Sequence, residues 1–392
     1  MACIWNLKLN WSENGRVDRM STYKRLRVGV VFGGRSGEHE ISLRSARSIL
    51  DALDSQRYEV TQIGITHEGV WLVGENVLDA LKEGRLNGLT PAVILPVPTR
   101  NELYRLHPSQ LGEIFELFAT LDLVIPILHG TFGEDGTIQG LFEMADLAYV
   151  GAGVVGSSVG MDKGIFKDVM SSIGVPIVGF VTVLRREIEN DMEAVIAKAE
   201  AVAPYPLFVK PANLGSSVGI TKCRNRSDLH EGLLDAARYD RRVLVERGVN
   251  AREIEVSVLG NDDPQASMVG EILPSREFYS YEAKYLDDRS QLLIPAPISD
   301  QLTKQVQSLA VRSFKAVDAA GMARVDFLLD RETEELFLNE LNTIPGFTSI
   351  SMYPKLWEAS GIPYPALVDR LIELALERKA ERDRTVRRYD RA

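Results

Sequence analysis

The fold is decided by residues 27–53, RVGVVFGGRSGEHEISLRSARSILDAL. Residues 27–32 form a short apolar run that predicts a buried strand, and the sequence GGRSGEHE follows it directly. Between Ala46 and Leu53, apolar residues then recur at the spacing of one helix face. The order of strand, glycine turn and helix indicates an α/β fold.

The same alternation continues downstream and predicts a parallel sheet with helices on both faces. Residues 58–65 alternate as a strand, and residues 121–128 form a buried-type strand that ends in HGTFGEDG. Ligands of such sheets bind beyond the carboxyl ends of the strands, where both glycine-rich turns would lie. We therefore expect Glu40, His129 and Glu134 near a functional site.

After residue 150 the pattern changes to two smaller α+β units. The first opens with a predicted helix over 161–173, and helices from about residue 352 close the second. The predicted strands span residues 180–184, 206–210, 218–222 and 243–246 in one unit, and 253–259, 266–273, 322–329 and 335–341 in the other. The expected divisions are an extension over 1–24, domains over 25–150, 151–248 and 249–378, and a charged tail over 379–392.

Composition excludes several classes of protein. Across 392 residues the net charge of −10 argues against a nucleic-acid surface, which needs clustered basic residues. The two cysteines, Cys3 and Cys223, lack a zinc spacing and cannot build a disulfide framework. No stretch approaches the roughly 20 apolar residues of a membrane span, so we expect a cytoplasmic protein. Residues 1–19 precede the first patterned strand and are expected to lie outside the fold.

Two glycine-rich segments compete as phosphate sites. The sequence GAGVVG at 151–156 resembles a dinucleotide fingerprint, but the acidic residue that should end a second strand about 20 residues on is missing. The segment KPANLGSSVGI at 210–220 is the better cradle, because glycine backbone N–H groups and the hydroxyls of Ser216 and Ser217 can approach phosphate oxygens. It could equally be an ordinary hairpin. Lys163 offers a second cation and favours the nucleotide-phosphate interpretation.

The most informative polar cluster lies between residues 324 and 342, where RVDFLLD and LFLNELN predict neighbouring strands joined by a polar turn. Side chains two apart share one face of a strand. If the polar faces coincide, Asp326, Glu340 and Asn342 present hard oxygen ligands that suit Mg²⁺. Arg324 beside them could stabilise an oxyanion. A solvated hairpin face is the alternative, which the flanking apolar residues disfavour.

The next turn, NTIPGFTSIS, adds two candidates. Gly346 can bring its backbone N–H close to a reacting carbonyl, and Ser351 can hold a carboxylate. Taken alone, the stretch could be no more than a turn leading into a helix.

Together these motifs are similar to those of one known family. The segments GGRSGEHEIS, HGTFGEDGTIQG, SVGMDK, VKPANLGSSVGI, YEAKYL, RVDFLLD and NELNTIPGFTSIS occur in the order found in D-alanine:D-alanine ligases of the ATP-grasp superfamily. The resemblance spans about residues 26–375. It implies a three-domain ATP-grasp fold, with an N-terminal substrate domain and ATP held between the central and C-terminal domains.

The resemblance also implies roles for individual residues. Those assigned to ATP are Lys163, Lys210, Ser216, Ser217, Glu246, Glu253 and Lys284, and those assigned to two Mg²⁺ ions, with Mn²⁺ as a substitute, are Asp326, Glu340 and Asn342. On the substrate side, Glu40 would bind the ammonium of the first substrate and be linked through Ser216 to Tyr285. Arg324 and the Gly346 N–H would donate to the oxyanion. Ser351 would bind the carboxylate of the second substrate, and His129 would also lie on the substrate side. Lys284 and Tyr285 would lie in a lid over 279–293.

The implied reaction joins two D-alanine molecules through a D-alanyl phosphate, with ADP and phosphate as co-products, for peptidoglycan precursor synthesis. Related enzymes use D-lactate or D-serine as the second substrate, but Tyr285 within EAKY matches the dipeptide-forming pattern. A nucleotide-binding sensor is a second alternative, and a kinase or carboxylase that forms an acyl phosphate on another acid is a third. The intact set of charged residues favours the ligase. The resemblance further suggests a homodimer.

Overall fold

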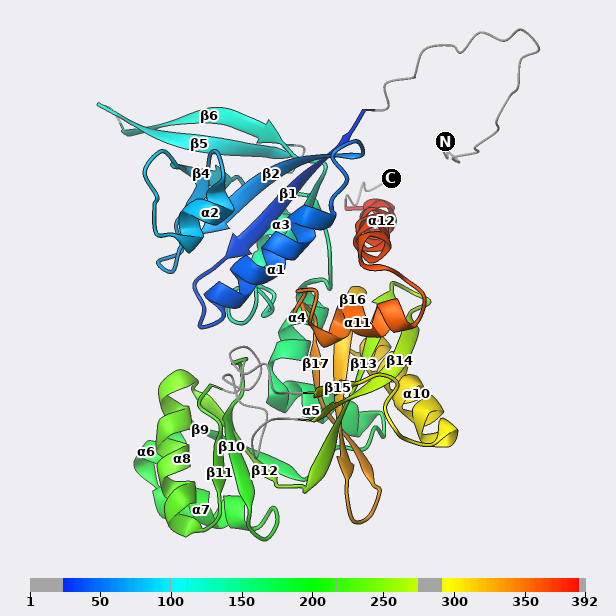
Figure 1. Cartoon of the computed structure of the whole chain (residues 1–392). Coiled ribbons are helices and arrows are strands. Elements are labelled where there is room, and N and C mark those ends of the chain that lie inside the picture. The colour runs from blue at the N-terminus through cyan, green and yellow to red at the C-terminus, as the bar shows by residue number, and fades with distance from the viewer. Residues whose placement is uncertain (1–23, 99, 111, 216–217, 274–290, 388–392) are drawn as a thin grey trace, which may run out of the picture.

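The structure is a computed structural model that describes residues 24–387 except 99, 111, 216–217 and 274–290. In that part of the chain the strands form three sheets, and each sheet carries its own helices (Figure 1). The sheets fall in residues 26–149, 180–247 and 251–342. Among the described helices none is long and apolar enough to cross a membrane.

The N-terminal sheet has eight strands in the order β6-β5-β4-β3-β2-β1-β7-β8. They are β1 Leu26–Gly33, β2 Tyr58–Ile65, β3 Trp71–Val73, β4 Thr90–Ile94, β5 Glu102–Ser109, β6 Gly112–Thr120, β7 Leu123–Ile127 and β8 Ala148–Tyr149. The predicted parallel sheet is confirmed for β2, β1, β7 and β8. The antiparallel extension from β3 to β6 was not predicted.

Helices cover both faces of this sheet, as predicted. Alternate residues of β1 point to opposite faces, so Val30 packs with α1 (His39–Ala52) while Val31 packs with α3 (Thr137–Met144). A shorter helix, α2 (Val77–Lys82), adjoins β2. The face that carries α1 also receives α12 (Tyr364–Asp383) from the far end of the chain. Figure 1 shows α12 beside the N-terminal unit.

The central sheet is antiparallel, in the order β11-β10-β12-β9. Its elements are β9 Phe180–Leu184, α6 Arg185–Asn190, α7 Met192–Glu200, β10 Leu207–Pro211, β11 Thr221–Cys223, α8 Arg226–Tyr239 and β12 Arg242–Arg247. The three helices bury one apolar core against these strands. Between β10 and β11 lies the glycine-rich loop, which therefore leaves the end of a strand as the sequence predicts.

The C-terminal sheet is also antiparallel, in the order β15-β14-β13-β16-β17. Its strands are β13 Ala251–Gly260, β14 Gln265–Leu273, β15 Gln291–Leu293, β16 Gly321–Asp330 and β17 Leu336–Asn342, and its helices are α10 Asp300–Ala316 and α11 Met352–Ala359. Helices α4 (Val154–Met161) and α5 (Lys163–Ser172) also contact this unit: α4 packs on β17 and α5 on α10. Mixed α/β architecture with further antiparallel sheets confirms the predicted fold class.

Two details differ from the prediction. The helix expected over 161–173 is divided, because α4 ends at Met161 and the Asp162 carboxylate caps α5 by accepting hydrogen bonds from Gly164 N and Ile165 N. Helix α12 continues to Asp383 and so includes the first residues of the charged tail expected over 379–392. Lys379 and Arg382 extend the helix because they pair with acidic residues of the N-terminal unit.

Candidate functional site

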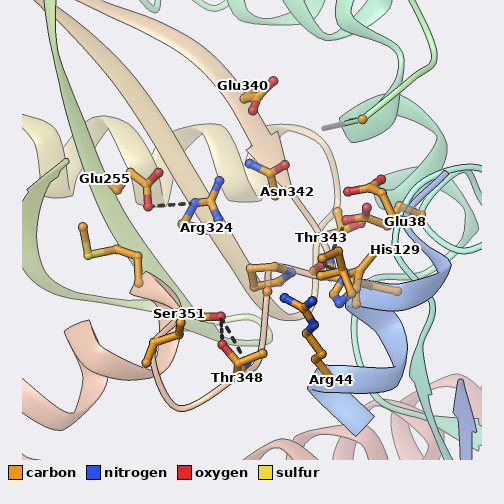
Figure 2. A pocket seen from close by; sticks show the side chains of 18 of the residues that line it. Glu38, Arg44, His129, Glu255, Arg324, Glu340, Asn342, Thr343, Thr348 and Ser351 are labelled. Carbon is orange, nitrogen blue, oxygen red and sulfur yellow. Dashed lines mark hydrogen bonds and ion pairs between the residues drawn. The ribbon is translucent and has the colours of Figure 1, made fainter. Parts of the chain in front are cut away.

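A cavity of about 1010 Å³ opens where the three units meet. Its walls come from α1, from the HGTFGEDG turn, from the start of α5, from the glycine-rich loop and from the segment that follows β17. Figure 2 shows Arg324, Asn342 and Glu340 on neighbouring strands, with Glu38 and His129 across from them. Residues from distant parts of the sequence therefore share one site.

The predicted coincidence of polar faces on β16 and β17 is confirmed. Arg324 lies opposite Asn342, and Asp326 lies opposite Glu340. Asn342 Nδ2 donates to Asp326 Oδ2 at 3.0 Å, so the two predicted ligands touch. All four side chains are buried or half-buried, which excludes a fully solvated hairpin face.

Arg324 is held by two carboxylates. Its Nε and Nη2 donate to Asp326 at 2.8 and 2.7 Å, and Nε lies 3.0 Å from Glu255 Oε2. Burial opposes the charge on Arg324, but Asp326 and Glu255 outweigh it and raise its pKa well above the usual value. The guanidinium therefore stays charged inside the protein. Sequence analysis missed Glu255, although its position on β13, two residues after Glu253, would place both on one strand face.

Two lysines, Lys167 of α5 and Lys210 of β10, converge on Glu246 of β12. Lys210 Nζ donates to Glu246 Oε2 at 2.7 Å, and Lys167 Nζ lies 3.3 Å from Oε1. Burial acts to raise the pKa of Glu246, yet the two ammonium groups lower it to about 2. Burial lowers the pKa of Lys167, which is only 1% exposed.

Two lysines of α5 lie near this site: Lys163, which was predicted from the sequence, and Lys167, which was not. The two residues are four apart, so both lie on one side of α5. Lys163 lines the cavity, but its Nζ donates to the backbone carbonyl of Leu214 at 2.6 Å. It thus anchors the glycine-rich loop, whereas Lys167 lies beside Lys210. Glu253, the predicted ribose contact, is half-buried on β13.

The structure favours Glu38 over Glu40 as the carboxylate of the site. Glu38 is buried, and a Cβ built on Gly215 would lie 2.5 Å from its Oε2, so the carboxylate packs directly against the glycine-rich loop. Glu40 lines the cavity but is exposed, next to the stacked rings of His39 and His67. The spacing of two at a helix start explains the difference, because such residues cannot both face inward.

His129 and Glu134 are both buried in the wall of the cavity. Burial lowers the pKa of His129, which leaves the imidazole neutral. Burial, together with the nearby charge of Glu38, raises the pKa of Glu134 to about 8. Both side chains bond the backbone of Ile344, in the segment that leads to Gly346.

The two predicted residues of the downstream turn lie together. Ser351 precedes α11, and its Oγ accepts a hydrogen bond from Thr348 N at 3.1 Å. A Cβ on Gly346 would lie 3.1 Å from the same Oγ. Both residues line the cavity beside Arg324.

Four predicted residues lie outside the described part of the chain: Ser216, Ser217, Lys284 and Tyr285. The predicted lid over 279–293 overlaps the same undescribed region, so the roles that involve these side chains stay predictions.

Comparisons with known proteins agree with this arrangement. The family models for the D-ala D-ala ligase N-terminus and C-terminus match residues 27–152 and 169–373. The D-alanine–D-alanine ligase of Heliobacterium modesticaldum is 51% identical over 357 residues, which cover 91% of this chain and 96% of the relative. The relative from Natranaerobius thermophilus with the same name is 48% identical over 92% of this chain and 98% of its own length.

Solved structures give the same result. The D-alanine-D-alanine ligase of Coxiella burnetii matches with a TM-score of 0.77 and 36% identity, covering 92% of this chain and 97% of that one. The VanG D-Ala:D-Ser ligase of Enterococcus faecalis matches with a TM-score of 0.79 and 34% identity, covering 90% and 100%. The resemblance noted from the motifs is confirmed over both halves of the sequence, and the chain belongs to the D-alanine–D-alanine ligase family.

Proposed function

We propose that this chain joins two D-alanine molecules into D-alanyl-D-alanine at the expense of ATP, as a step of peptidoglycan precursor synthesis. One observation carries the proposal beyond family membership. Arg324 on β16 lies opposite Asn342 on β17, Asp326 lies opposite Glu340, and Arg324, Glu340 and Asn342 line the cavity of about 1010 Å³. A cation and three oxygen-bearing side chains thus meet where phosphoryl and acyl transfer would occur.

The triphosphate would lie near Lys167 and Lys210. Glu246 contacts both ammonium groups, and the phosphate oxygens of ATP would add counter-charge. Glu246 and Glu253 remain our candidates for the adenine and ribose contacts. Lys163, Ser216, Ser217 and Lys284 are proposed to complete the phosphate site.

Asp326, Glu340 and Asn342 fit Mg²⁺, since carboxylate and amide oxygens are the donors that this ion prefers. Asn342 donates to Asp326 through Nδ2, which leaves its Oδ1 available as a ligand. Two bound Mg²⁺ ions, with Mn²⁺ as a substitute, would offset negative charge on the phosphate oxygens.

The proposed reaction would take place in two steps. The carboxylate of the first D-alanine takes the terminal phosphoryl group, which gives ADP and D-alanyl phosphate, and Glu38 would hold the ammonium of that substrate. The amine of the second D-alanine then attacks the acyl carbon, and phosphate leaves. Arg324 and the Gly346 N–H would meet the oxyanion, and Ser351 would hold the second carboxylate; their common position in the lining of one cavity supports these roles.

A turnover assay tests the proposal. Purified protein with ATP, Mg²⁺ and D-alanine should release ADP and yield D-alanyl-D-alanine by mass spectrometry, and Asp326→Ala should abolish both. Parallel reactions replace the second substrate with D-lactate, D-serine or L-alanine. ADP release that needs D-serine or D-lactate would refute the choice of second substrate, and ATP binding without any turnover would support the nucleotide-sensor alternative instead.

The homodimer stays a prediction from the resemblance, and the cytoplasmic location stays a prediction from the sequence. A homodimer should show twice the mass of one chain by light scattering coupled to size-exclusion chromatography. A mass equal to that of a single chain at micromolar concentration would contradict it.

A further inference from the structure

The segment that follows β17 enters the cavity wall with its backbone held on both sides of Gly346. Thr343, Ile344 and Phe347 are almost completely buried, whereas Gly346 is half-buried and lines the cavity. A backbone N–H can stabilise an oxyanion only if its direction is fixed before the reaction. What holds this segment is therefore part of how the site operates.

Glu134 holds the segment from the HGTFGEDG turn. Its Oε1 accepts a hydrogen bond from Ile344 N at 2.9 Å, and its Oε2 accepts one from Gly130 N at 2.9 Å. Only 8% of Glu134 is exposed, so water cannot easily replace either bond. One carboxylate thus joins a turn of the N-terminal unit to the end of β17.

His129 and Ser45 hold the same segment through a directed chain of hydrogen bonds. The carbonyl of Ile344 can only accept, so His129 Nδ1 donates to it at 2.9 Å and Nε2 is the acceptor nitrogen. Ser45 Oγ then donates to Nε2 at 3.0 Å and accepts from Phe347 N at 3.3 Å. Every donor in this chain meets an acceptor when His129 is neutral.

These hydrogen bonds hold the backbone both before and after Gly346. Glu134 and His129 fix the N–H and C=O of Ile344, and Ser45 fixes the N–H of Phe347, which leaves Pro345 and Gly346 spanning between two held residues. Proline restricts its own φ as well. The direction of the Gly346 N–H is consequently set by three buried side chains that come from the N-terminal unit.

We propose that Glu134, His129 and Ser45 are positioning residues that aim the Gly346 N–H at the reacting acyl group. The kinetic part of the proposal rests on the ligase function proposed above. The geometric part, that these side chains immobilise residues 344–347, does not.

The test compares Glu134→Gln and Glu134→Ala with Asp135→Asn. Asp135 is a matched control in the same turn: its carboxylate accepts from Phe132 N and Thr137 N, both inside the N-terminal unit. Hydrogen exchange should become at least 10-fold faster at the Ile344 and Phe347 amides in Glu134→Ala, less so in Glu134→Gln, and should not change in Asp135→Asn. This readout needs no turnover, so it separates the proposal from the assignment of the ligase reaction.

Kinetics supply the second readout. Dipeptide kcat should fall at least 10-fold in Glu134→Gln and further in Glu134→Ala, while the Kd for ATP stays within 2-fold because Lys167, Lys210 and Glu246 are untouched. Ser45→Ala should likewise reduce kcat without changing the Kd for ATP. Unchanged exchange at 344–347 in Glu134→Ala, or a kcat loss no larger than that of Asp135→Asn, would overturn the proposal.

Discussion

Glu246→Gln is the substitution whose effect on the free energy of unfolding follows most directly from the structure. Glu246 is 97% buried and faces Lys167 and Lys210, and its pKa of about 2 lies below the ordinary value of 4.5. A lowered folded-state pKa stabilises the fold at every pH above the unfolded value, and this contribution disappears as the pH falls from about 4.5 to about 2. The difference corresponds to about 3 kcal/mol at neutral pH.

The variant also leaves Lys167 without its carboxylate in a buried position. Removing one partner of a buried ion pair typically lowers the free energy of unfolding by roughly 3–5 kcal/mol. If the uncompensated ammonium is the cause, then adding Lys167→Met to Glu246→Gln should recover much of the loss. The free energy of unfolding should therefore be lower in Glu246→Gln than in the double variant that also carries Lys167→Met.

Hydrogen exchange at pH 7 without ATP measures this cost in the central unit itself. Amides of β10 and β12 should exchange about 100-fold faster in Glu246→Gln, because each 1.4 kcal/mol changes the open population tenfold. Glu193→Gln is the control: Glu193 pairs with Arg226 in the same unit but has 79% of its side chain exposed, so exchange should change less than 3-fold. Equal, small effects of both variants would refute the reasoning, since the buried lysines would then need no carboxylate.

Three further outcomes are expected. Arg324→Lys should lower kcat at least 100-fold while ATP still binds by calorimetry, because one ammonium cannot reproduce the forked contacts with Asp326 and Glu255. Gly33→Ala should lower Tm by about 5 °C more than Gly84→Ala in a thermal scan, because both glycines have positive φ but only at Gly33 would a Cβ lie 2.2 Å from a β2 carbonyl oxygen. EDTA should stop ADP release, and excess Mg²⁺ should restore it.

Strand periodicity was enough to predict the polar face between residues 324 and 342. Alternation places Arg324 and Asp326 on one face, and a short polar turn brings β17 back beside β16. The register shift between Asp326 and Phe327 was not predictable, because a bulge of this kind depends on tertiary packing rather than on local sequence.

Charged side chains on helices were harder to choose between. Lys163 on α5 and Glu40 on α1 were predicted from the sequence, whereas the more buried Lys167 and Glu38 were not. Which member enters the protein depends on a partner from another unit: Glu246 on β12 receives Lys167, and the glycine-rich loop receives Glu38. Local periodicity does not contain that information.

Packing between elements far apart in the sequence was likewise not predictable. Strands β3 to β6 are short or have an exposed face, so they lack the apolar runs that marked β1 and β7. Helix α12 carries a helical apolar repeat, but its partners in the N-terminal unit, α1, β7 and β8, lie more than 200 residues earlier. Only the folded chain shows that its C-terminal helix completes the N-terminal core.

The cations of the site each face a buried carboxylate. Lys167 and Lys210 face Glu246, and Arg324 faces Glu255 and Asp326. An isolated buried cation is unfavourable, whereas a cation that is paired with a carboxylate is held in a fixed position. Bound phosphate and acyl groups would then meet charges that are already oriented, so little reorganisation accompanies the reaction. The carboxylates that stabilise these cations thereby also orient them toward anionic substrates.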